Sequence, residues 1–276
     1  MDRVLREPSI DRLSVRIQAG IRVHSLNQAL HTAGYALHNA GAIAEQSLAG
    51  ATQTSTHGTG RNLGSMASQI LSMSIVLANG TIVEASTSQN KDIFSAGRVG
   101  LGSLGVVVEL EMSVAPAFKI LRTTTGWDLD ELVEALPGLN DRFERLQWYW
   151  TPNTKNATLL TRVPVANTAK IGHGCWPDAG PGPNTSCVDW SYKALSHPSS
   201  FDHTRALYTE MEYFVPTRYA MALVTEFREF QDSIRGDLER LCQSPTCGLF
   251  AGIRYVAQAL ILSTIQYPTS ILELSP

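Results

Sequence analysis

Residues 41–60 combine the residue types in this chain that are best suited to binding a ligand. They read GAIAEQSLAGATQTSTHGTG and combine glycines with short hydroxyl and amide side chains. Glycine lets main-chain N–H groups approach a ligand without an intervening Cβ, and successive amides of this kind hold anions such as phosphate. Donors suited to a diphosphate and a sugar-like chain are Ser47, Thr52, Thr54, Ser55, Thr56 and Thr59. We predict a loop that binds a nucleotide cofactor, with a tight surface turn as the alternative.

His57 lies inside this loop and has three interpretations. It could act as a general base, bind a metal ion or hydrogen-bond within the loop. No Cys, Asp or second His lies nearby at ligand spacing, so a metal is the weakest of the three. We expect a loop histidine near the cofactor and no metal site.

Two further groups of residues could contact a substrate. Arg254 carries a permanent positive charge that could stabilise an anion or orient a carbonyl oxygen, although an ion-paired structural arginine is an equal alternative. The aromatic residues Trp148, Tyr149 and Trp150 could line a sugar site, but an aromatic strand more often belongs to a core.

The elements around the loop follow from hydrophobic periodicity. Residues 13–19 alternate apolar and polar side chains as a strand does, and residues 23–33 show helical spacing. Gly34 provides a left-handed end for that helix, and a short apolar run at 35–37 leads into the loop. Strand, helix and strand thus precede the glycine-rich segment.

The segment after the loop is predicted to form a hairpin, a helix and a strand. Residues 70–77 and 81–85 read as strands joined by a type I′ turn at Asn79 and Gly80. Residues 92–98 suit a short helix, and residues 106–114 read as a strand that buries Val106, Val108, Leu110, Met112 and Val114. Pro116 closes this unit, so we place a domain boundary near residue 117.

The second half has a less regular pattern. We predict a helix at 129–136, strands at 147–150 and 158–163, and a long loop at 172–186. A strand at 208–215, a long amphipathic helix at 218–241 and a strand at 248–256 follow.

Composition limits the partners of the chain. Its 276 residues allow two modest domains, and the net charge of -3 without a basic run argues against nucleic acid. The N-terminus has no apolar region typical of a secretory signal, and the longest nearly uncharged stretch reads as two strands rather than a membrane span.

The four cysteines lack the spacing of a zinc site and are expected to be free thiols. A serine hydrolase is excluded because Ser103 lacks the spacing of a nucleophile elbow.

The chain resembles a known family in the glycine-rich loop and in five further segments. Residues 46–60 are similar to Q-x-x-A-G-x-x-x-T-x-T-H-G-T-G, a motif of the aldonolactone oxidoreductases. These are vanillyl-alcohol-oxidase-type flavoproteins that include L-gulonolactone oxidase and D-arabinono-1,4-lactone oxidase. Similar segments lie at 19–37, at 101–107 (LGSLGVV), at 143–154 and at 211–216 (MEYFVP), and Arg254 lies in a segment like the strand that carries the family's arginine.

The chain also departs from the family pattern. Nothing before Asp11 corresponds to the P-x-G-x-G-H-S loop, and no H-W-[AG]-K segment precedes Pro276. Gly252 occupies the position where many members have a glutamate. We expect a shortened isoform or an internal fragment of such an enzyme.

The resemblance implies a fold, a cofactor and a reaction. It implies an α+β protein, with the second part of a PCMH/VAO-type FAD-binding domain at 1–117 and an incomplete α+β substrate (cap) domain at 118–276. The chain would bind FAD and oxidise an aldono-1,4-lactone, of the L-gulono or D-arabinono type, with O2 or another acceptor, in ascorbate-type biosynthesis. Peripheral membrane association, at the endoplasmic reticulum or mitochondrion, would follow. The alternative is a flavin-binding fragment without turnover.

The resemblance also assigns roles to residues. Arg254 would be the catalytic contact to substrate or flavin. FAD would be held by Ser47, Gly50, Thr54, Thr56, His57, Gly58, Gly60, Gly105, Val106 and Val107.

Overall fold

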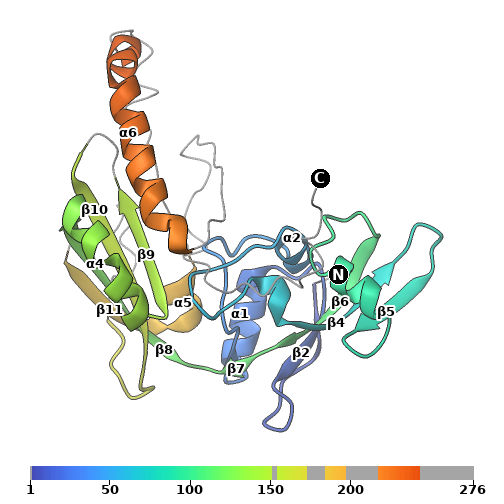
Figure 1. Ribbon diagram of the computed structural model, residues 1–276. Helices are drawn as coiled ribbons and strands as arrows, with labels where there is room; N and C mark the ends of the chain where they lie inside the picture. The colour runs from blue at the N-terminus through green and yellow to red at the C-terminus, as the bar shows by residue number, and fades with distance from the viewer. Residues whose placement is uncertain (1, 151–153, 173–183, 197–216, 243–276) are drawn as a thin grey trace.

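The computed structural model describes residues 2–150, 154–172, 184–196 and 217–242. Two antiparallel sheets stand apart in the molecule, and helices pack against both (Figure 1). Each sheet has its own buried cluster of apolar side chains, one formed by residues between 15 and 114 and another by residues between 129 and 159. The predicted α+β class is confirmed.

The first sheet has five strands in the order β1-β2-β6-β4-β5. Its strands are β1 Val4–Arg6, β2 Ser14–Gln18, β6 Val106–Ser113, β4 Ile70–Val76 and β5 Ile82–Ser86. The predicted alternation is confirmed for Val15 and Ile17, which are completely buried, but Leu13 at its start is exposed. Residues 23–33 form the predicted helix, α1 Val23–Thr32, and Gly34 follows it with φ +85°. The smaller elements of this part are α2 Leu48–Gln53, η1 Met66–Gln69, α3 Lys91–Gly97 and the strand pair β3 Tyr35–Ala36 and β7 Ala115–Pro116.

The hairpin of β4 and β5 is confirmed, but its turn differs from the prediction. A type I′ turn needs positive φ at both central residues, whereas Gly80 has φ +80° and Asn79 is not among the described residues with positive φ. The Gly80 amide donates to the Leu77 carbonyl at 2.9 Å, so residues 77–80 form the β-turn and Gly80 follows its two central residues. The connection is thus one residue longer than a two-residue turn, with glycine at the left-handed position.

Strand β6 also departs from its predicted alternation. Leu110 and Met112 are buried as expected, but Val106 is exposed and Val107 is buried. The register explains this reversal, because Ser74 pairs with Glu109 while the next residue, Ile75, pairs with Val107. The extra residue in β6 is a bulge, which moves the side chains before it to the opposite faces of the sheet.

The second sheet has the order β11-β8-β10-β9. Its strands are β8 Lys119–Asp128, β9 Arg145–Trp150, β10 Asn156–Val165 and β11 Thr185–Trp190. The predictions of β9 and β10 are confirmed, whereas β8 was not predicted. The end of the predicted loop at 172–186 is wrong, because Thr185 and Ser186 belong to β11.

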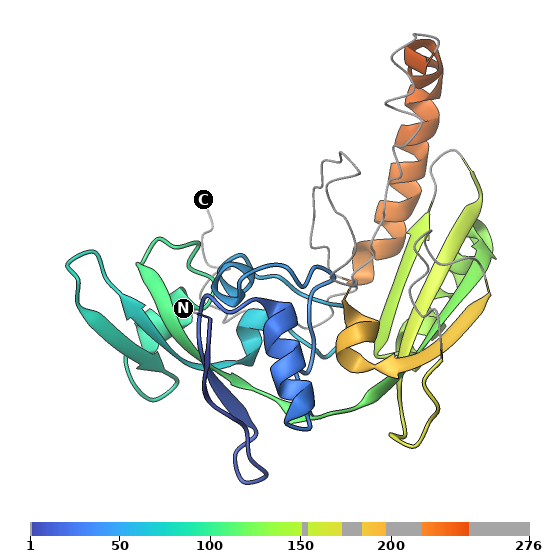
Figure 2. The same ribbon diagram turned by 180° about the vertical axis from the view of Figure 1, so that it is seen from behind.

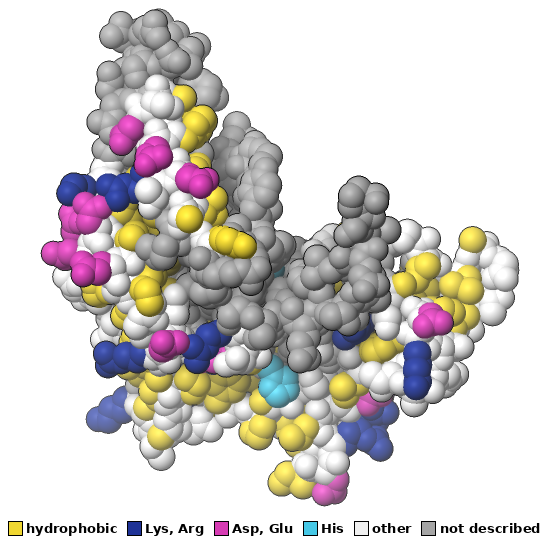
Figure 3. All heavy atoms as spheres, in the orientation of Figure 1, with side chains coloured by type: hydrophobic (Ala, Val, Ile, Leu, Met, Phe, Trp, Pro, Cys, Tyr) yellow, Lys and Arg dark blue, Asp and Glu magenta, His cyan; other side chains and the backbone are white. Residues whose placement is uncertain are grey.

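Helices cover one face of this sheet. The helix α4 Leu129–Arg142 packs Leu129, Leu132 and Leu136 against Trp148 and neighbouring strand residues. The long helix α6 Thr217–Cys242 confirms the amphipathic prediction, since Val224 and Phe227 pack against the same cluster. Figure 2 shows α6 projecting beyond the sheet, and Figure 3 shows hydrophobic side chains along one side of it. The short helix α5 Ser191–Leu195 follows β11.

Some expectations lie outside the described residues. These are the strands at 208–215 and 248–256 and the candidate Arg254. The expectation of free thiols is wrong for Cys187, which is disulfide-bonded. Among the described helices, none is long and apolar enough to cross a membrane.

Candidate functional site

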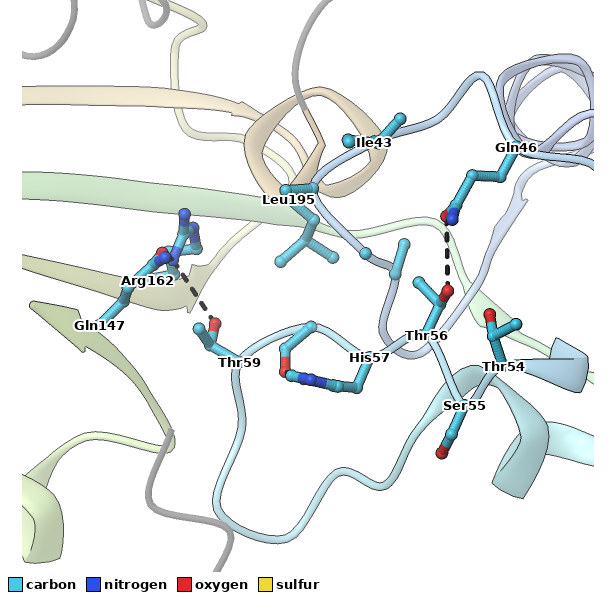
Figure 4. Close-up of a pocket in the computed structure, with 14 residues that line it drawn as sticks. Ile43, Gln46, Thr54, Ser55, Thr56, His57, Thr59, Gln147, Arg162 and Leu195 are labelled. Carbon is cyan, nitrogen blue, oxygen red and sulfur yellow. Dashed lines mark hydrogen bonds between the residues drawn. The ribbon is translucent and has the colours of Figure 1, made fainter. Parts of the chain in front are cut away.

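A cavity of about 400 Å³ lies where the glycine-rich segment meets the second sheet. Figure 4 shows loop side chains on one side of it and strand side chains on the other. Such a volume is in the range of small-molecule sites and accommodates part of a dinucleotide. The lining comes from Ala40, Gly41, Ala42, Ile43, Gln46, Thr54, Ser55, Thr56, His57, Gly58, Thr59, Gln147, Arg162 and Leu195.

The wall of the cavity is formed by two loop segments that approach each other closely. A Cβ placed on Gly58 would lie 2.3 Å from the carbonyl oxygen of Ala40, and one on Gly41 would lie 2.5 Å from Cγ2 of Thr56. Side chains at these positions would separate the segments. We expected glycine 58 to make room for phosphate, but its missing Cβ accommodates the chain's own backbone.

The main-chain amides of these two segments are a second feature of the cavity wall. Within the described part of the chain, no acceptor pairs with the amides of residues 41–43 or 58–60. Most of these residues line the cavity. Clustered amides without protein acceptors are what a diphosphate or a flavin carbonyl needs. The residues present therefore fit a flavin dinucleotide.

Three predicted cofactor residues lie at the ends of α2, which we expected to be loop. Ser47 caps this helix by accepting a hydrogen bond from the Gly50 amide at 3.2 Å. Thr54 follows the last residue, donates from its hydroxyl to the Gly50 carbonyl at 3.0 Å and lines the cavity. Ser47 and Gly50 are thus engaged in shaping the helix, while Thr54 reaches the site.

Thr56 and His57 lie directly on the cavity. Thr56 donates its main-chain amide to the Ala51 carbonyl at 2.8 Å, and its hydroxyl lies 3.5 Å from Oε1 of Gln46. Nδ1 of His57 lies 3.1 Å from the carbonyl oxygen of Gly58. This contact supports the interpretation of His57 as a loop residue beside the cavity.

Gly105, Val106 and Val107 lie away from the cavity lining, at the start of β6. A Cβ on Gly105 would lie 2.2 Å from the carbonyl oxygen of Val76, so this glycine allows two strands to meet. The preceding turn contacts α2, because the side-chain oxygen of Gln53 accepts from the Gly102 amide at 3.3 Å. Gly60, with φ +153°, ends the Thr56–Gly60 segment next to Leu63.

Sequence reasoning missed the residues that the second sheet contributes. The guanidinium of Arg162 donates to Oε1 of Gln147 at 3.1 Å and to the Thr59 hydroxyl at 3.5 Å, which joins the sheet to the loop (Figure 4). Burial lowers the pKa of Arg162 to about 10. No local sequence signal singled out Arg162, because its neighbours Arg122 and Arg145 are placed opposite it only by strand register.

The three aromatic residues of β9 lie on two different faces of the second sheet. Trp148 is completely buried and Trp150 nearly so, and both belong to the apolar cluster under α4, which confirms their core interpretation. Tyr149 points to the opposite face of the sheet because neighbouring strand residues alternate. That face also carries Gln147, which lines the cavity.

Comparison with known proteins shows what this architecture resembles. Residues 1–86 match the family described as FAD binding domain. A solved structure, a solvent-stable cholesterol oxidase, aligns with a TM-score of 0.50 and 23% identity over 56% of this chain and 33% of that one. This likeness concerns the fold and is consistent with a PCMH-type FAD-binding domain.

Curated relatives match a larger part of the chain. L-gulonolactone oxidase of Bos taurus is 33% identical over 173 residues, which are 61% of this chain and 39% of the relative. D-arabinono-1,4-lactone oxidase of Yarrowia lipolytica is 31% identical over 59% of this chain and 32% of its own length. The mitochondrial L-galactono-1,4-lactone dehydrogenase of Brassica oleracea is 34% identical over 60% of this chain and 28% of its own length.

The chain therefore matches less than half the length of each of these relatives. The matched length of 173 residues exceeds the 86 residues that match the FAD binding domain. The chain is thus similar to aldonolactone oxidases and dehydrogenases, and its residues 1–86 match an FAD binding domain.

Proposed function

We propose that this chain binds FAD and contributes to oxidation of an aldono-1,4-lactone. The observation that carries the proposal is one cavity that is lined both by loop residues 41–43, 58 and 59, whose amides have no acceptor among the described residues, and by Arg162 and Gln147 of the second sheet. Amides suit the polar parts of a flavin dinucleotide, and a fixed cation suits an oxygen that gains negative charge.

In this proposal, the loop residues bind the cofactor and the sheet residues position the substrate. The loop amides, together with the hydroxyls of Thr54 and Thr56, hold the cofactor by hydrogen bonds. Bound FAD supplies the hydride acceptor. Arg162 and Gln147, fixed by their mutual hydrogen bond at 3.1 Å, orient a lactone oxygen at the sheet side of the cavity. Arg254 remains a second candidate for this contact.

The finer features of the activity are taken from the relatives. The substrate is of the L-gulono- or D-arabinono-1,4-lactone type, as the names of the relatives suggest. O2 is the proposed acceptor, although one relative is named a dehydrogenase. We also propose a role in ascorbate-type biosynthesis and peripheral membrane association, at the endoplasmic reticulum or mitochondrion.

The alternative function is flavin binding without turnover. It is favoured by the match to only 28–39% of these relatives, because their remaining parts could supply further cofactor and substrate contacts. Fewer contacts reduce affinity and positioning together.

Anaerobic reduction of bound flavin distinguishes the two functions. The purified chain is mixed with FAD and L-gulono-1,4-lactone, and the visible flavin band is followed without oxygen. Bleaching of that band, absent when lactone is omitted, is the expected result. Bound flavin that keeps its colour with L-gulono-, D-arabinono- and L-galactono-1,4-lactone would contradict the enzymatic proposal and support the fragment.

A further inference from the structure

Three arginines lie side by side across the second sheet. In the strand register, Arg162 of β10 is directly opposite Arg122 of β8 and also directly opposite Arg145 of β9. Directly opposite residues of antiparallel strands project from the same face with Cβ atoms about 5 Å apart. We call these three residues the arginine row.

The arginine row is buried. Arg122, Arg145 and Arg162 are only 4%, 6% and 5% exposed. Burial lowers the pKa of all three guanidinium groups, and the positive charges of Arg122 and Arg145 further lower that of Arg162. Like charges at directly opposite positions destabilise a sheet, so this arrangement has a cost that the fold must offset.

The described partners of Arg162 and Arg145 are neutral. Arg162 donates to the Ala194 carbonyl at 3.2 Å as well as to Gln147 and Thr59. Arg145 donates to the His38 carbonyl at 3.0 Å, and its buried Nε has no hydrogen-bond partner. Among the described residues, no carboxylate forms an ion pair with either arginine.

A nearby carboxylate is occupied elsewhere. Glu144 raises the pKa of Arg145 by its charge, but its two oxygens accept from the main-chain amide and the side chain of Asn62, at 2.7 and 2.8 Å. The charges of Arg162 and Arg145 are thus left without a matching negative charge in the described part of the protein. Buried charges are normally paired, so a negatively charged ligand is the missing component.

We propose that the arginine row, through Arg162 at the cavity and Arg145 beside it, binds an oxyanion of a ligand, a carboxylate or a phosphate group. Guanidinium groups bind both through paired N–H donors. Two sources share this chemistry, the diphosphate of the dinucleotide and the carboxylate of a small molecule such as an open-chain sugar acid. The proposal requires no redox activity.

Titration of the full chain with sulfate, a probe for either oxyanion, tests the proposal. Calorimetry and thermal unfolding at constant ionic strength, with chloride as the balancing salt, should show saturable binding that raises the melting temperature. Arg162→Gln should weaken sulfate binding by about 10- to 100-fold, because it removes a charged hydrogen-bond donor. Arg228→Gln is the matched control, since Arg228 is paired with Asp130 on the surface, and should bind sulfate as the unaltered chain does.

The melting temperature and the sulfate affinity of Arg162→Gln together show whether the arginine row binds a ligand or only stabilises the fold. Removing one charge from a repelling row should leave the melting temperature without sulfate unchanged or raised, whereas removing one member of an internal ion pair would lower it. No saturable sulfate binding, or equal binding by Arg162→Gln and the unaltered chain, would overturn the proposal. If Arg162→Gln does not fold, Arg145→Gln provides the same comparison.

Competition identifies the source of the oxyanion. If FAD displaces sulfate and riboflavin, which has no phosphate, does not, the arginine row holds the diphosphate. If sulfate binds together with FAD and gluconate displaces it, the row holds a substrate carboxylate. A chain that binds sulfate but no FAD would leave the arginine row intact as a site and contradict the proposed flavin function.

Discussion

Gly58 controls the shape of the site through the side chain that it lacks. Its position against Ala40 brings the segments at 40–43 and 56–60 together, and most residues of both segments line one cavity. The same contact explains why glycine is needed at this position. The residue acts on the cofactor indirectly, by fixing the wall from which the donors project.

We predict that Gly58→Val destabilises the chain and abolishes FAD retention. A Cβ at this position would lie 2.3 Å from the Ala40 carbonyl oxygen and 2.5 Å from Oδ1 of Asn39, so the two segments must move apart. The cost should be about 1–3 kcal/mol of unfolding free energy, as for other overpacked positions. Urea unfolding and retention of FAD on gel filtration measure both effects.

The control for this variant is Gly138→Ala. A Cβ on Gly138 of α4 would meet nothing within 4 Å, so the control should retain FAD fully. Normal FAD retention by Gly58→Val would show that the approach of the two segments does not shape the binding site.

At the residue scale, the sequence indicates the loop side of the site but not the sheet side. Thr54, Thr56, His57 and Gly58 were predicted from a local motif and do line one cavity. Arg162 was not predicted, because its function depends on strand register with Arg122 and Arg145, which lie far from it in the chain. No local pattern encodes that register.

At the element scale, helix α4 provides a local test of how the sequence positions the second sheet. Asp128, the N-cap residue directly before the helix, accepts a hydrogen bond from the Asp130 amide at 2.9 Å. The helix then packs three leucines against the sheet that carries Arg162 on its other face. The cap and the leucines together fix the layer behind the site.

We predict that Asp128→Ala lowers the unfolding free energy by about 0.5–2 kcal/mol, because the first turn of α4 loses its side-chain acceptor. Asp128→Asn keeps an acceptor and should lose much less. Thermal and urea unfolding of both variants make the comparison. An equal loss in the two variants would show that charge, rather than capping, is the contribution of Asp128.

Elements were predicted well where their pattern was local and uninterrupted. The helices α1 and α6 and the β4–β5 hairpin follow from periodicity and turn residues. The reversal at Val106 and Val107 was not predictable in this way, since a bulge is defined by the partner strand. Strand β8 was missed because its stretch KILRTTTGWD, which begins just after the expected boundary, is largely polar.

At the scale of the whole molecule, the site is formed by residues that are far apart in the sequence. The cavity joins Gly41 and Gly58 with Gln147, Arg162 and Leu195, which come from loop, sheet and helix. A further contact ties them together, because Ser196 donates to the Gly41 carbonyl at 2.8 Å. The α+β class could be predicted from element order, but this convergence depends on long-range packing that the sequence does not show.

Hydrogen exchange measured with and without FAD tests the account most directly. The central claim is that main-chain amides at 41–43 and 58–60 bind the flavin dinucleotide, because they lack acceptors among the described residues. Saturating FAD should slow exchange of these amides, while amides of α4 on the far side of the sheet stay unchanged. Tight FAD binding with no protection at 41–43 and 58–60, or no FAD binding at concentrations up to about 1 mM, would contradict the claim.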